Sequence, residues 1–105
     1  MKEITVSELK KMKDSGEDFQ LIDIREPHEV DICEIGGELI PMGDVMNRVN
    51  EISKTKKVVV HCKSGKRSAN VIQVLESQKG FTNLYNLKGG ILAYAEEIDP
   101  NLTKY

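Results

Sequence analysis

Short apolar segments alternate along the chain with stretches whose apolar residues recur every three or four positions. Residues 19–24 and 57–62 are apolar almost throughout, which is typical of strands buried on both faces of a sheet. Residues 84–87 are a shorter candidate strand, and Leu39-Ile40 ahead of Pro41 is another. The pattern therefore predicts four short strands separated by helical segments.

Local signals mark the ends of the predicted helices. Thr5 and Glu8 have the spacing of a capping box, in which each side chain accepts a hydrogen bond from the backbone of the other residue. Pro27 suits the first turn of a helix, and Gly80 suits a helix end. The predicted helices lie between Thr5 and Gly16, over about 26–32, around Val45, Met46 and Val49, from Ser68 to Gly80, and over about 91–98.

Strands that alternate with helices indicate βαβ units. We therefore expect a single α/β domain over residues 1–105. It should have three layers, with a mostly parallel sheet of four to five strands and helices on both faces. Ligands of such sheets bind beyond the carboxyl ends of the strands. The segments that follow Ile24 and His61 are accordingly the best candidates for a functional site.

Composition narrows the classes of function. The formal net charge is −2, from 15 basic and 17 acidic side chains, so no nucleic-acid partner is expected. No apolar run approaches the ~20 residues of a membrane helix, and the first residues lack the apolar stretch of a signal peptide. We expect a soluble cytoplasmic protein with no membrane partner, in which Cys33 and Cys62 are not a disulfide framework.

The segment after the second long apolar run carries the strongest chemical signal. Cys62 ends this predicted strand, and the residues that follow it are Lys63, Ser64, Gly65, Lys66, Arg67 and Ser68. A loop that leads into a helix can turn several backbone N–H groups toward an anion. Together with the nearby cations, these groups should lower the pKa of Cys62 below that of a free thiol. Cys62 is thus predicted to be a nucleophile, although a small buried residue is the alternative.

Other chemically capable residues have weaker signals. Arg25 follows the first long strand, so it either lines a pocket beside Cys62 or pairs with Glu29 on a short helix. His61 should point to the opposite face from Cys62, because adjacent strand residues alternate. Cys33 has no basic loop around it and is predicted to be structural. The cysteines and histidines lack zinc-like spacing, so neither a metal nor another cofactor is predicted.

Three separated motifs resemble the rhodanese family. The segment from Cys62 to Arg67 has the length of that family's active loop, with a glycine inside it. Residues 23–29 (Asp-Ile-Arg-Glu-Pro-His-Glu) are similar to its first motif, and residues 87–94 (Leu-Lys-Gly-Gly-Ile-Leu-Ala-Tyr) to its last. Residues 30–41 look most like the rhodanese tail of enzymes that adenylate sulfur-carrier proteins.

This resemblance implies a sulfurtransferase. In that mechanism Cys62 takes a sulfur atom from thiosulfate or a persulfide, holds it as a persulfide, and gives it to a thiol or cyanide. A sulfur-carrier protein or another persulfide-bearing protein is a possible partner. The sequence departs from the family pattern at Tyr94, where tryptophan is usual, and at Lys63, where members that use thiosulfate often have arginine. The second departure leaves the donor open, because lysine is a point charge and arginine a planar fork.

Two other functions remain open at this point. Cysteine phosphatases and arsenate reductases also place a cysteine and an arginine around an anion cradle, but their loop has one more residue than the segment from Cys62 to Arg67. A non-catalytic interaction module is the other alternative, and the presence of Cys62 argues against it.

Overall fold

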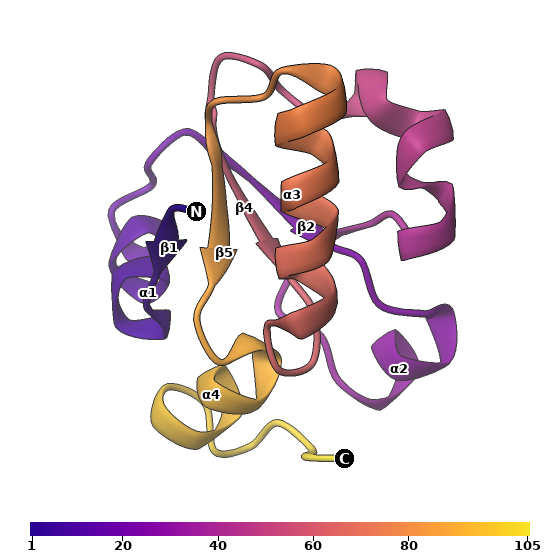
Figure 1. Cartoon of the computed structure of the whole chain (residues 1–105). Coiled ribbons are helices and arrows are strands. Elements are labelled where there is room, and N and C mark those ends of the chain that lie inside the picture. The colour runs from indigo at the N-terminus through magenta and orange to yellow at the C-terminus, as the bar shows by residue number, and fades with distance from the viewer.

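Five parallel strands form one sheet in the computed structural model, which describes all 105 residues (Figure 1). The sheet order is β1-β5-β4-β2-β3. The strands are β1 (Glu3–Ile4), β2 (Phe19–Asp23), β3 (Glu38–Leu39), β4 (Lys57–His61) and β5 (Leu84–Leu87). Every neighbouring pair is parallel, so the predicted α/β fold class is confirmed. The two-residue strand β1 was not predicted; β3 is as short, but the glycines before it and Pro41 after it marked its position.

Helices cover both faces of the sheet. Their bounds are α1 (Val6–Asp14), α2 (Pro27–Ile32), η1 (Met42–Glu51), α3 (Lys66–Lys79) and α4 (Gly90–Glu97). The predicted capping box begins α1: the Glu8 backbone N–H donates to Thr5 Oγ1 at 3.1 Å, and the Thr5 N–H donates to Glu8 Oε1 at 3.0 Å. No helix has the length and apolar character needed to cross a membrane.

Two apolar clusters fill the space between the sheet and the helices. One combines strand residues with side chains of α3 and η1, and the other combines strand residues with α1 and α4. The alternation along β4 decides which cluster each side chain enters: Val58, Val60 and Cys62 belong to the α3 cluster, whereas Val59 belongs to the α1 cluster. Cys62 therefore points toward α3.

Two predicted helices differ from the structure. Residues 42–51 form 3₁₀ turns with a kink at Arg48, so Met46 is exposed instead of sharing a buried face with Val45. α3 begins at Lys66, two residues earlier than expected, because Gly65 adopts φ +101° and serves as its N-cap. Lys66 and Arg67 therefore lie in the first helical turn, and the loop is shorter than predicted.

Candidate active site

Cys62 lies directly beyond the carboxyl end of β4, where the start of α4 packs against it. Its side chain is 1% exposed. The Ile91 N–H donates to the Cys62 carbonyl at 3.0 Å, and the Leu92 N–H donates to the Lys63 carbonyl at 3.1 Å. A Cβ at Gly90 would lie 2.3 Å from that Lys63 oxygen, so only glycine permits this approach. The back of the loop is thus fixed to α4.

Hydrogen-bond donors converge on the sulfur of Cys62. The Gly65 N–H donates to Sγ at 3.1 Å, and the Ser68 N–H donates to it at 3.5 Å. The hydroxyl of Ser68 lies 3.4 Å from Sγ. This arrangement is the anion cradle that the sequence predicts, built by the turn at Gly65 and the first turn of α3.

The cradle changes the acidity of the thiol. Burial opposes ionisation of Cys62, but hydrogen bonds from the Ser68 hydroxyl and from the N–H groups of Ser68, Gly65 and Ser64 outweigh it. The pKa of Cys62 is therefore lowered from its ordinary value. The expected direction agrees with the structure, and its cause is the hydrogen bonds of the loop more than the lysines.

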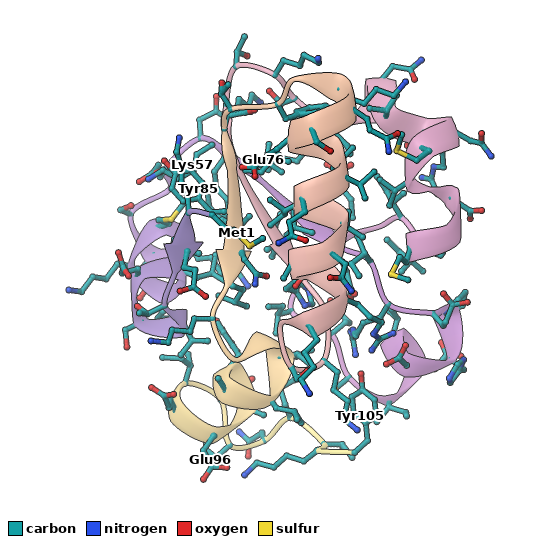
Figure 2. All side chains as sticks on the ribbon, viewed as in Figure 1. Met1, Lys57, Glu76, Tyr85, Glu96 and Tyr105 are labelled. Atoms are coloured by element: carbon teal, nitrogen blue, oxygen red, sulfur yellow. The ribbon has the colours of Figure 1, made fainter.

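The three cations near Cys62 have different surroundings. Arg67 donates two hydrogen bonds of 2.8 Å to the carboxylate of Glu29, which fixes its guanidinium against α2. The Lys63 ammonium lies 4.5 Å from the centroid of the Tyr105 ring, and Lys66 is exposed. Figure 2 shows Tyr105 at the end of the molecule where α2 and α4 lie. The two lysines are thus the cations with no carboxylate partner here.

Arg25 is fully buried and serves the structure. Its Nε and Nη2 donate to the Asp23 carboxylate, and its remaining N–H groups donate to the Glu29 and Cys33 carbonyls and to the Tyr105 hydroxyl. All five donors are occupied, so none is left for a ligand. The geometry does not support a pocket role for Arg25. Its alternative side-chain pairing with Glu29 is also wrong, because only the Glu29 carbonyl accepts from it.

His61 and Cys33 occupy the opposite side of the sheet from the cradle. The His61 ring is buried, with Nε2 3.6 Å from Asp23 Oδ2, and burial lowers its pKa. It faces away from Cys62 Sγ, as the strand alternation predicts. Cys33 is buried in the apolar cluster under α1 and α4, and no group of side chains has a metal-binding arrangement.

Three residues that support the site were not identified from the sequence in these roles. Glu29 holds Arg67, Tyr105 donates to Glu29 at 2.8 Å, and Asn86 contacts both Ser68 and Gly65. Asn86 carried a weak signal, since a polar residue stood inside an apolar strand. The partners of Glu29 and Tyr105 are too far away in sequence for any local pattern to reveal.

The structure is thus a parallel α/β domain in which backbone N–H groups surround a cysteine at the end of a strand. Comparison with known proteins makes the assignment specific. Residues 5–97 match the model of the rhodanese-like domain, and the chain belongs to that family.

Similar proteins agree with this assignment. The chain is 38% identical over 101 residues to the putative sulfurtransferase YtwF of Bacillus subtilis, covering 95% of this chain and 96% of YtwF. It is 35% identical over 105 residues to the probable adenylyltransferase/sulfurtransferase MoeZ of Mycobacterium tuberculosis. The match covers 97% of this chain but only 26% of MoeZ, and the resemblance to the tails of adenylating enzymes is thereby confirmed.

Solved structures share the fold. A rhodanese-like domain protein from Staphylococcus aureus superposes with a TM-score of 0.83 at 31% identity, covering 93% of this chain and 95% of that protein. Family membership and the sulfurtransferase relatives together support sulfur transfer as the general chemistry.

Proposed function

We propose that this protein is a sulfurtransferase that carries sulfane sulfur as a persulfide on Cys62. The observation that supports this most directly is the position of Sγ, which accepts the N–H groups of Gly65 at 3.1 Å and Ser68 at 3.5 Å. Such donors stabilise a negative sulfur without a histidine base. His61 faces the other side of the sheet and is not needed for this step.

In the first half-reaction the Cys62 thiolate attacks the outer sulfur of a donor. With thiosulfate, a bond forms between Sγ and the sulfane sulfur, and the bond to the sulfite sulfur breaks. Sulfite leaves with the electron pair of that bond, and Cys62 becomes a persulfide with a negative outer sulfur. The exposed Lys66 and the half-buried Lys63 would attract the dianionic donor.

In the second half-reaction an acceptor removes the outer sulfur. A thiolate or cyanide attacks it, the S–S bond breaks, and Cys62 leaves as a thiolate stabilised by the same N–H groups. The products are a new persulfide or thiocyanate, and the charge balances in both cases. The acceptor in the cell is a thiol, and the proposed protein partner is a sulfur-carrier protein or a persulfide-bearing protein.

Intact mass after incubation with thiosulfate tests the proposal. We expect one added sulfur atom, located at Cys62 by peptide mapping and lost on treatment with cyanide. Addition at Cys33 would overturn the assignment of the nucleophile. A chain that takes up no sulfur from thiosulfate or from a small-molecule persulfide would instead favour the interaction module. A Cys62-dependent hydrolysis of para-nitrophenyl phosphate would favour the phosphatase.

A further inference from the structure

A buried amide links both ends of the turn that surrounds Cys62. Asn86 is 4% exposed and lies near the end of β5, on the face that α3 covers. Its Nδ2 donates to the Gly65 carbonyl at 3.1 Å, and its Oδ1 accepts from the Ser68 hydroxyl at 2.5 Å. Gly65 and Ser68 are the residues whose N–H groups reach Sγ, so Asn86 contacts the cradle without touching the sulfur.

The orientation of this amide is fixed. A carbonyl only accepts hydrogen bonds, so the NH₂ group of Asn86 must face the Gly65 oxygen and Oδ1 must face Ser68. A serine hydroxyl has one hydrogen. This hydrogen points at Asn86, because Ser68 Oγ lies 2.5 Å from Asn86 Oδ1 and 3.4 Å from Cys62 Sγ. The Ser68 oxygen then presents a lone pair to Cys62, which suits a thiol that donates its own hydrogen.

The thiolate reverses this requirement, because a negative sulfur needs donors and has no hydrogen to give. We propose that Asn86 is a positioning residue, which holds the Ser68 hydrogen while Cys62 is a thiol and releases it to the sulfur when the thiolate forms. The inference rests on the proposed role of Cys62 as nucleophile. The hydroxyl hydrogen bond lowers the pKa of Cys62, and Asn86 limits that effect, because the hydroxyl must turn away from the amide before it can donate to the thiolate.

The same switch follows the charge through sulfur transfer. Once Cys62 carries a second sulfur, the negative charge moves to the outer atom and Sγ becomes a neutral bridging sulfur. The Ser68 hydrogen then returns to Oδ1, its stronger acceptor. The hydroxyl thus alternates between Asn86 and Cys62 in each catalytic cycle.

Charged groups around Cys62 come from several elements and do not move in this switch. Arg67, in the first turn of α3, interacts with the Cys62 charge and is paired with Glu29 of α2. Lys63 precedes the turn, and Lys66 begins α3. On the far face of the sheet lie the ion pair of Asp23 and Arg25, at the end of β2, and the His61 ring. These titratable groups face away from Sγ. From the C-terminal segment, Tyr105 contacts Lys63 and Glu29.

A double-mutant cycle on Asn86→Ala and Ser68→Ala tests the proposal. The readout is the rate of iodoacetamide alkylation of Cys62 against pH, followed by peptide mapping so that Cys33 does not contribute. Asn83→Ala is the matched control. The Asn83 amide also donates to backbone carbonyls, such as that of Ser53 at 2.8 Å, but it lies at the other end of β5, far from Cys62.

With Ser68 present, removal of the Asn86 side chain frees the hydroxyl to donate to the thiolate throughout. The alkylation midpoint should fall by about one pH unit, which is a tenfold larger thiolate fraction below the midpoint. In the Ser68→Ala background the same change should produce little further shift, and Asn83→Ala should leave the midpoint unchanged. Equal shifts in both backgrounds would show that Asn86 acts through the Gly65 carbonyl, and the proposal would be wrong.

A single variant keeps the test decisive if Asn86→Ala does not fold. Ser68→Ala alone should raise the midpoint by well under one pH unit, because the hydrogen is shared with Asn86 in the wild type. A tenfold loss of thiolate in that variant would overturn the inference. Alkylation needs no sulfur donor, so coupling between Asn86 and Ser68 can be present even if neither thiosulfate nor a small-molecule persulfide loads Cys62. That outcome would refute the proposed function and leave the positioning role intact.

Discussion

Replacement of Glu29 by glutamine should lower the free energy of unfolding by more than the loss of an exposed ion pair would. Each carboxylate oxygen of Glu29 accepts two hydrogen bonds. Oε1 accepts from Arg67 and Tyr105, and Oε2 accepts from Arg67 and the Glu26 N–H, at distances of 2.8 to 2.9 Å. In either orientation, the NH₂ group of a glutamine would face two donors. The substitution keeps the shape of the side chain but removes its charge and replaces one of its two accepting oxygens by a donor.

The magnitude follows from burial. The Glu29 side chain is 8% exposed, whereas that of Arg67 is 34% exposed, so the arginine can regain water when its partner is lost. Breaking a fully buried pair costs about 3–5 kcal/mol, and an exposed pair is worth about 0–1 kcal/mol. We expect Glu29→Gln to lower the free energy of unfolding by about 2–3 kcal/mol.

Urea denaturation of Glu29→Gln and Glu51→Gln provides the measurement and its control. Glu51 also pairs with an arginine through two bonds, of 2.8 and 2.9 Å to Arg48, but its side chain is 48% exposed whereas that of Glu29 is 8% exposed. The loss of the Glu51 carboxylate should destabilise the fold far less than the loss of the Glu29 carboxylate. Equal costs for the two variants, or a Glu29→Gln cost below 0.5 kcal/mol, would refute the argument from burial.

The pH dependence gives a second check on Glu29. Its hydrogen bond with Arg67 holds the pKa of Glu29 well below its usual range, although burial opposes this. Because the folded pKa is lowered, the stabilisation is complete above the ordinary glutamate pKa of about 4.3 and is lost as the pH falls further. The difference between wild type and Glu29→Gln should therefore be constant near neutrality and shrink in acid.

Three further predictions concern the site itself. Cys62→Ser should keep the fold and abolish cyanide-dependent thiocyanate formation, because a hydroxyl cannot carry a persulfide; unchanged turnover would remove the mechanism. The alkylation midpoint of wild-type Cys62 should lie below that of a free thiol, and a midpoint at about 8.5 would show that desolvation cancels the cradle. Lys63→Ala and Lys66→Ala should each weaken the use of thiosulfate more than that of a neutral donor, with a penalty that shrinks in added salt, as steady-state kinetics at two salt concentrations can show.

The sequence predicted the parts of the site that are local in the chain. A β-branched run that ends in Cys62 and is followed by Gly65 gives the strand, the turn and the donors to Sγ within residues 57–68. The helix start was misplaced by two residues, because the conformation of Gly65 that allows an early start leaves no mark on hydrophobic spacing.

The supporting contacts could not be predicted, because they join residues that are distant in sequence. Arg67 meets Glu29 across 38 positions, and Ser68 meets Asn86 across 18. The sequence showed Arg25 after a strand end but not that its five donors would be used inside the fold. Which polar residues become paired depends on the order of the strands in the sheet. That order results from the packing of the whole chain, so local patterns in the sequence do not reveal it.

The all-parallel sheet also has a consequence for how the protein folds. Parallel neighbours cannot be joined by tight hairpins, and β1 near the start of the chain pairs with β5 near its end, Glu3 beside Asn86. Such non-local pairing slows folding, since a large loop must close before the contacts form. β5 carries Asn86 and leads into Gly90, which packs behind Cys62. A nascent or partly folded chain in which only β2, β4 and α3 have assembled would therefore expose a cysteine without its completed surroundings, and reactivity of Cys62 should mature only when β5 docks.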